Sequence, residues 1–119
     1  MHEIALMSDI FTIIEKDWNK RNLEPVNKVS LIVGELSNAM PDALSMAFDI
    51  HKTYNYPFLA NEAQLVIHIE KALAKCTICG ESYEPDQRIS NCPNCKLPSG
   101  KIIQGETFKI QSYESRDQE

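Results

Sequence analysis

The chain has 119 residues, 43% of them apolar, which is enough for one modest hydrophobic core with a small appendage but not for two independent cores. Seventeen acidic residues against twelve basic ones give a formal net charge of -5, and the scattered lysines and arginines disfavour binding to nucleic acid. No apolar run approaches the roughly 20 residues that cross a bilayer, and the opening residues lack the basic start of a signal peptide. We therefore expect a cytoplasmic protein without a membrane partner.

The first segment, residues 4–18, has the pattern of an amphipathic helix. Projected at about 100° per residue, its apolar side chains cover roughly half of the circumference, interrupted only by Asp17. These side chains are Ile4, Leu6, Met7, Ile10, Phe11, Ile13, Ile14 and Trp18. Because so broad an apolar face needs a flat surface, we expect this helix to lie on a sheet.

Three strands and a second helix are predicted after it. Residues 29–34 form an alternating, β-branched run that ends at Gly34, which indicates a strand. Pro41 supplies a preset φ at a helix start, so we expect a second helix from there to about Lys52. Alternation predicts a second strand over residues 65–70 and a third over residues 102–113, with Gly105 as a bulge.

All four cysteines fall into two pairs, Cys76-x-x-Cys79 and Cys92-x-x-Cys95. Two tight turns of this kind present four soft thiolates to one tetrahedral ion, and zinc is the default occupant. Residues 73–101 contain few large apolar side chains, so this segment is expected to take its folding free energy from the ion, on the order of 10 kcal/mol for structural zinc. Four thiolates leave no position for water, which argues against a catalytic ion.

Other readings of the cysteines stay open. Rubredoxin-like iron also uses four thiolates, and Cys92-Pro93-Asn94-Cys95 could be a redox dithiol, although no thioredoxin-like strand and helix surround it. A zinc-ribbon adaptor that binds nucleic acid or protein is a further alternative, although basic and acidic residues balance within 75–96. No nucleophile elbow, P-loop or His-Glu-x-x-His motif occurs, so we do not expect an enzyme.

The predicted elements indicate an α+β fold: a small three-stranded sheet packed by two helices, with an inserted zinc-ribbon subdomain before the last strand. The insertion follows because both strands that flank the cysteine loop have to leave and re-enter the same sheet. We place one α/β domain at residues 1–72 together with 103–119, and the zinc-binding domain at residues 73–102.

The first three residues, Met1, His2 and Glu3, form a second candidate metal site. A free α-amine, the amide nitrogen of His2 and its Nδ1 atom can form adjoining chelate rings, and the amide of Glu3 can close another. Such a site needs a metal that displaces amide protons, and Ni(II) and Cu(II) in square-planar nitrogen coordination do so. The alternative is that His2 is an exposed side chain near a chain end and binds no metal. Of the other histidines, we expect His51 to be partly buried and hydrogen-bonded, and His68 to be exposed.

The chain resembles the HypA/HybF family of hydrogenase nickel-insertion accessory proteins over nearly its full length. The resemblance is carried by MHEIAL at the start, GELSNAMPDALSMAFD at residues 34–49, and the two cysteine pairs before a final strand. It implies a nickel metallochaperone, with Ni(II) as transferred cargo on His2, Met1 and Glu3. It also implies structural Zn(II) on the four cysteines, Cys76, Cys79, Cys92 and Cys95.

The same resemblance implies partners. They are a HypB-type GTPase and the large subunit of a [NiFe] hydrogenase, with urease maturation in some members, and a homodimer is left open. Residues 55–58 depart from the family pattern, because they lack the small polar residues expected between the second helix and the second strand. This departure bears on partner contacts there, not on metal binding.

Overall fold

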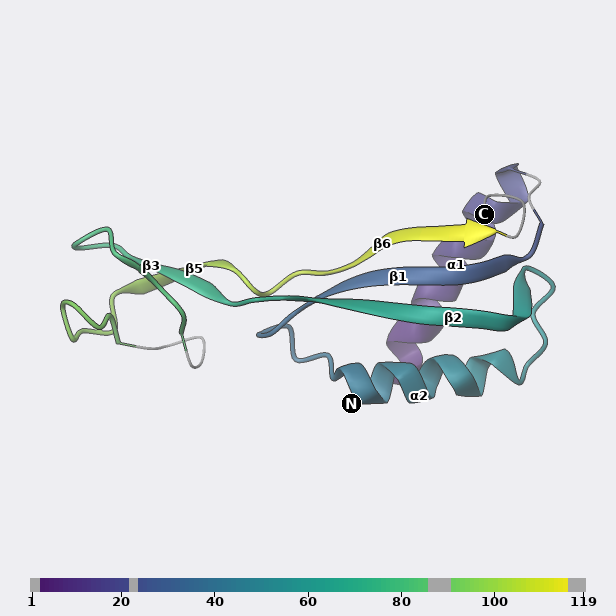
Figure 1. Ribbon diagram of the computed structural model, residues 1–119, viewed down its shortest axis with the longest axis horizontal. Helices are drawn as coiled ribbons and strands as arrows, with labels where there is room; N and C mark the ends of the chain where they lie inside the picture. The colour runs from purple at the N-terminus through teal and green to yellow at the C-terminus, as the bar shows by residue number, and fades with distance from the viewer. Residues whose placement is uncertain (1–2, 22–23, 86–90, 116–119) are drawn as a thin grey trace.

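The computed structural model describes residues 3–21, 24–85 and 91–115 of the chain. Its elements, in chain order, are α1 (Glu3–Arg21), β1 (Val26–Gly34), α2 (Pro41–Lys52), β2 (Leu59–Glu70), β3 (Leu73–Cys76), β4 (Ser82–Tyr83), β5 (Gly100–Gln104) and β6 (Phe108–Ser115). The molecule is elongated, 54 × 27 × 20 Å. Both helices and one sheet lie at one end, and a smaller sheet lies at the other (Figure 1).

The main sheet has the strand order β2-β1-β6, so β1 is its central strand. β1 pairs in parallel with β2 and antiparallel with β6. Val29, Leu31 and Val33 of β1 point to one face and are at most 1% exposed, since the helices cover that face and both neighbouring strands cover the edges. The register places Ile67 of β2 and Ile110 of β6 beside Leu31, and this row forms the floor of the core.

The helix α1 buries a narrower stripe than its sequence predicts. Its buried apolar residues are Met7, Ile10, Phe11 and Ile14, which follow the i, i+3, i+4, i+7 spacing of a single helix face. Ile4 and Ile13, on the margins of the predicted face, are 54% and 57% exposed. The ring of Phe11 meets Phe48 and Phe58 edge-to-face, with centroids 5.7 Å apart in both pairs, and these contacts join both helices to the sheet.

The predicted α+β architecture is confirmed, including the second helix from Pro41 to Lys52 and the return of β2 and β6 to one sheet. All three strand predictions are wrong in their limits, and β1 begins at Val26 rather than at residue 29. β2 begins at Leu59 rather than at residue 65, because the polar pair Asn61-Glu62 breaks the alternation without ending the strand. The division into residues 1–72 with 103–119 and residues 73–102 stays a prediction.

The predicted third strand, residues 102–113, is in fact two strands in two sheets. β5 pairs with β3 in the small sheet, and β6 pairs with β1 in the main sheet. The chain crosses between the sheets at Gly105, whose φ of +112° is open to glycine at little cost. A Cβ at this residue would lie 2.6 Å from the Cα of Ala72. The expected bulge within one strand is therefore a crossing between two.

Backbone hydrogen bonds close the junction between the sheets. Gly34 N–H donates to the carbonyl of Thr107 at 2.6 Å, and Leu36 N–H donates to that of Gly105 at 2.7 Å. Glu35 N–H donates to the carbonyl of Glu70 at 3.0 Å. The end of β1 is thus bonded to the segment that leaves the main sheet and to the segment that returns to it.

Two carboxylates strengthen this junction. Glu35 accepts the N–H of Ala72 at 2.6 Å, and Glu70 accepts the N–H of Gly105 at 2.8 Å. This hydrogen bond lowers the pKa of Glu70 below its ordinary value, because a carboxylate that accepts backbone donors is favoured in its charged form. We name this set of residues, Gly34, Glu35, Glu70, Ala72 and Gly105, the sheet junction.

We predict that Gly34→Ala destabilises the protein by about 2 kcal/mol or more. A Cβ at this residue would overlap the carbonyl group of Gly105, and backbone cannot move aside as a side chain can. Chemical denaturation of the zinc-loaded protein measures the change. The matched control is Gly80→Ala, where a Cβ meets nothing within 4 Å, so only the strain of its positive φ remains, about 1 kcal/mol. Equal losses for the two variants would contradict the close approach at the junction.

Candidate metal centre

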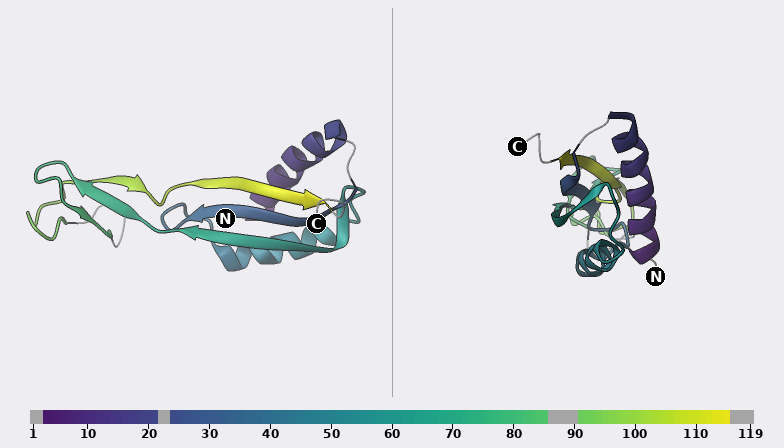
Figure 2. Two further views of the ribbon diagram at one scale, coloured as in Figure 1. Left: turned by 45° about the horizontal axis from the view of Figure 1, so that its top comes forward. Right: turned by 90° about the vertical axis from the view of Figure 1, so that its right-hand side faces the viewer.

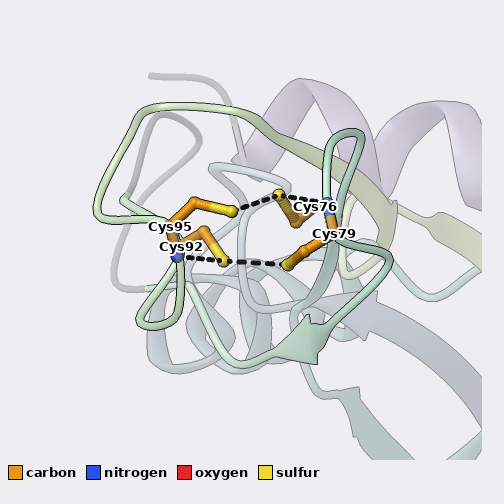
Figure 3. A group of neighbouring side chains, drawn as sticks. All are labelled: Cys76, Cys79, Cys92 and Cys95. Atoms are coloured by element: carbon orange, nitrogen blue, oxygen red, sulfur yellow. Dashed lines mark hydrogen bonds between the residues drawn. The ribbon is translucent and has the colours of Figure 1, made fainter.

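The small sheet carries the four cysteines at its far end. It has the strand order β4-β3-β5, with both pairings antiparallel. Cys76 is the last residue of β3, and Cys79 lies in the turn that leads back to β4. Cys92 and Cys95 lie in a second turn ahead of β5, so the two pairs face each other (Figure 3).

The two cysteine pairs lie in two separate turns that have the same backbone geometry. The N–H groups of Cys79 and Cys95 each point at the sulfur of the first cysteine of their pair, at 3.4 Å. Gly80 N–H donates to the Cys76 carbonyl, and Lys96 N–H donates to the Cys92 carbonyl. The residue after each pair has a positive φ, +77° at Gly80 and +59° at Lys96. Peptide dipoles of each turn are thus directed toward sulfur.

The four sulfur atoms have the spacing of a tetrahedral site. Cys76 Sγ lies 3.8 Å from Cys95 Sγ, and Cys79 Sγ lies 3.7 Å from Cys92 Sγ. All four lie within 4.8 Å of one another. Zinc–sulfur bonds of about 2.3 Å at tetrahedral angles would place sulfurs about 3.8 Å apart, whereas a disulfide requires about 2.05 Å. These residues therefore fit an ion at the centre of the cluster.

The pKa shifts of the cysteines also fit a metal ion at the centre of the cluster. The N–H of Cys79 and the hydroxyl of Ser99 lower the pKa of Cys76 to about 6. The neighbouring Cys79 sulfur and the loss of solvation raise the pKa of Cys95 to about 12. Four thiolates so close together repel one another, and a divalent cation among them removes this cost. Bound there, zinc would cross-link the two turns.

Ser99 contacts the cysteine cluster, and the sequence alone does not indicate this role. Its hydroxyl lies 3.0 Å from the sulfur of Cys76, and its carbonyl accepts the N–H and the hydroxyl of Thr77. The sequence shows Pro98-Ser99-Gly100 only as a turn. Its proximity to Cys76, 23 residues earlier, depends on the pairing of β3 with β5 and has no local signal.

The small sheet and its two cysteine turns, residues 73–85 and 91–104, have almost no hydrophobic core of their own. We call this part of the molecule the ribbon. Its fully buried apolar side chains among the described residues are small, namely Ala74, Cys76 and Cys92. The larger ones face solvent, with Ile78 at 65% exposed, Leu97 at 49% and Ile103 at 52%. At about 25 cal/mol per Å² of buried apolar surface, such small residues cannot offset the entropy of ordering the ribbon.

Of the three residues that the sequence suggests as nickel ligands, the structure describes only Glu3. Met1 and His2 lie outside the described residues, and Glu3 is the first residue of α1. The Glu3 carboxylate accepts the N–H of Met40, just ahead of α2, at 3.1 Å, and the residue is only 9% exposed. The start of α1 is therefore held against the start of α2.

The two other histidines behave as expected. His51 is 4% exposed, and its Nδ1 and Nε2 atoms lie 3.1 Å from the hydroxyl of Tyr56 and 3.2 Å from the carbonyl of Ile4. His68 is exposed on β2. Both of the His51 ring nitrogens have protein partners, so this side chain is a packing element and not an open ligand.

The chain resembles known proteins along its whole length. A family model described as "Hydrogenase/urease nickel incorporation, metallochaperone, hypA" matches residues 1–115. The hydrogenase maturation factor HypA of Aquifex aeolicus is 33% identical over 114 residues, which cover 96% of each chain. HypA 2 of Bradyrhizobium diazoefficiens is also 33% identical over 114 residues, covering 96% of this chain and 98% of its own.

Solved structures of HypA proteins have a similar fold. The solution structure of the Ni metallochaperone HypA from Helicobacter pylori matches with a TM-score of 0.64 and 23% identity, covering 97% of each chain. At this identity the likeness supports the fold alone. Within the described residues, neither helix is long and apolar enough to span a bilayer.

Removal of the metal should unfold the ribbon and spare the main sheet. We predict that chelation raises the hydrogen-exchange rates of amides in β3 and β5 by about a hundredfold or more, because the ion replaces a core there. Amides of β1 should keep most of their protection, and added zinc should restore the ribbon. Elemental analysis of the native protein distinguishes zinc from iron. Ribbon amides that stay protected without metal would contradict the prediction.

Loss of the Ser99 hydroxyl should weaken the metal site without removing a ligand. We predict that Ser99→Ala lowers zinc affinity about tenfold, because the hydrogen bond to Cys76 favours its thiolate. Competition with a chromophoric chelator measures the affinity. Ser82→Ala is the matched control, since Ser82 is exposed on β4 of the same sheet. An unchanged affinity for Ser99→Ala would leave Ser99 with a role in the turn only.

Proposed function

The chain belongs to the HypA family of hydrogenase and urease nickel metallochaperones, and on this premise we propose that it carries Ni(II) to a [NiFe] hydrogenase during maturation. The observation that carries the proposal is the family match over residues 1–115, which includes the amino terminus where the candidate nickel ligands lie. The ligands are the α-amine of Met1, the amide nitrogen and Nδ1 of His2, and the amide nitrogen of Glu3.

The position of Glu3 supports this ligand set. Glu3 lies in the first described turn of α1, and the amides of a first helical turn stand outside the i to i−4 hydrogen-bond ladder, so coordination at that nitrogen would not interrupt the helix. The carboxylate is engaged with the N–H of Met40. The side chain therefore positions the residue, and the backbone nitrogen is the donor offered to nickel.

Electrostatics at this end of α1 favour modest affinity. The positive end of the helix dipole disfavours a bound cation, and the Glu3 carboxylate offsets part of that cost. A set of donors from three consecutive residues can be released one at a time to a thiolate-rich acceptor. Such stepwise ligand exchange is what a carrier needs, so we assign this chain a transfer role and no catalysed reaction.

The cysteine cluster has a separate, structural role in this proposal. Zn(II) bound by Cys76, Cys79, Cys92 and Cys95 has four thiolate ligands and no open position for water or substrate. We propose that it shapes the ribbon and stays in place while nickel is transferred. The partners that we infer are a HypB-type GTPase and the hydrogenase large subunit, all in the cytoplasm, with urease as a second recipient.

Nickel binding should depend on a free and unmodified amino terminus. We predict that the native chain binds one Ni(II), and that His2→Ala, or one glycine added ahead of Met1, lowers the affinity by about a hundredfold or more. Isothermal titration with metal analysis measures nickel and zinc together, and the zinc content should not change. The control is His68→Ala, which removes an exposed histidine and should leave nickel affinity as it is.

Equal nickel stoichiometry and affinity in the native and extended chains would remove the amino-terminal site. Oligonucleotide binding that survives these changes and weakens with salt would favour a zinc-ribbon adaptor instead.

A further inference from the structure

We propose that the outer edge of β6 is a docking site for an extended segment of a partner protein, which adds to the main sheet as a fourth strand under α1. This site lies at the opposite end of α1 from Glu3 and is argued without reference to nickel binding. Four observations lead to it: the open edge, the covered edge opposite, the overhang of α1, and the groove between α1 and β6.

The first observation is that β6 is an edge strand. Within the part of the chain that the structure describes, β6 pairs with β1 and with no other strand. It spans Phe108–Ser115, and before the buried Ser115 such an edge presents a row of backbone donors and acceptors on its outer side. Extended peptides bind such edges by continuing the sheet.

The second observation is that the opposite edge, β2, is covered. α2 runs alongside β2 (Figure 1), and Lys52 Nζ donates to the carbonyl oxygen of Ala63 at 2.9 Å. The same ammonium group lies 5.8 Å from the ring centroid of Phe48. A lysine laid against an edge is a common way to block strand addition. The chain thus covers one edge of its main sheet with a helix, whereas the described part of β6 carries a bulge at Gln111 in place of such a cover.

The third observation is the length of α1. A helix of 19 residues is roughly 28 Å long, whereas three strands span only about 10 Å between the outer two. α1 crosses the strands, and its carboxyl-terminal turns extend past β6, as the right-hand view of Figure 2 shows. The overhang lies over the position that the next strand of the sheet would occupy.

The fourth observation is a groove between this overhang and β6. It is a cavity of about 420 Å³, lined by Ile13, Ile14, Asp17 and Arg21 of α1 and by Ile110, Gln111, Ser112 and Tyr113 of β6. Ile13 is 57% exposed there, which explains why the predicted apolar face of α1 is wider than the face that the core uses. An apolar side chain on an added strand would cover Ile13.

The end of the groove near Arg21 favours an acidic residue on the partner. Asp17 is already engaged, since its carboxylate accepts the hydroxyl of Tyr113 and pairs with Arg21 Nε at 2.9 Å. Lys20 follows Ile13 at the i+7 position, so it lies on the same face of the helix. Lys20 and Arg21 are both positively charged, and the carboxylate of Asp17 already has its partners. This end of the groove is therefore positive, although the whole chain has a net charge of -5.

The edge fits a separate peptide better than a second copy of this chain. The pairing of β6 with β1 shifts register between Ser30 and Leu31, which leaves Gln111 as an extra residue in β6. A bulge on an edge strand disfavours regular pairing with an identical strand, because two bulges would have to be matched at once. A short partner segment can pair on either side of Gln111.

The test uses the zinc-loaded full chain and a capped peptide of alternating valine and threonine with a glutamate at each end. We expect fluorescence anisotropy to show saturable binding, and peptide to slow exchange of β6 amides about tenfold with no effect on β2. Ile13→Glu should weaken binding at least about tenfold. The matched control is Met46→Glu, an exposed apolar residue of α2 at 65%, which should bind as the native chain does.

A charge test keeps the proposal open to refutation if Ile13→Glu perturbs the helix. Lys20→Glu should weaken the glutamate-ended peptide and strengthen a lysine-ended one. Absence of binding at about millimolar peptide, protection of β2 in place of β6, or equal loss in Met46→Glu would overturn the site. Self-association of the native chain that Ile13→Glu abolishes would also overturn it, because the occupant would then be a second copy. Nickel titration of the same samples tests the proposed function, and its result neither supports nor overturns the docking site.

Discussion

The whole molecule depends on the close approach of two glycine residues at the sheet junction. β2 leaves the main sheet and β6 returns to it on either side of β1, so both connections pass the end of β1 at Gly34. There is room for them only because Gly34 and Gly105 lack a Cβ. Hydrogen bonds from Glu35 and Glu70 then bind the outgoing and returning segments. An insertion that would otherwise hang from two strands is fixed to a rigid sheet.

The two ends of the molecule are stabilised by different physics. The main sheet and its helices bury a continuous apolar cluster that includes Phe11, Leu31 and Phe48, and its stability comes from surface removed from water. The ribbon buries chiefly small side chains and sulfur, so we expect its order to depend on metal coordination. Because coordination is local, we expect loss of the metal to affect the ribbon while the main sheet stays folded.

The sequence predicts those parts of the fold that local patterns determine. Helix period, the position of Pro41 and the two cysteine pairs are all local, and they give both helices, the insertion and four cysteines that the structure brings together. The limits of β2, the crossing at Gly105 and the contact of Ser99 with Cys76 depend on pairing between distant segments. Residues 102–113 alternate as one strand would, and only the presence of two sheets shows why the chain must turn at Gly105.

The length of α1 connects the two functional proposals. A helix that served only the core could begin at Met7 and end near Trp18, which packs against the buried cluster. The additional turns at each end do something else. The first turn holds Glu3 against Met40, and the last turn extends past β6 beside the groove. Because a helix is stiff over this length, a segment bound at β6 would sit at a set distance from Glu3. A partner held there would have its nickel acceptor at a defined place relative to the cargo, which favours transfer by direct ligand exchange over release into solution.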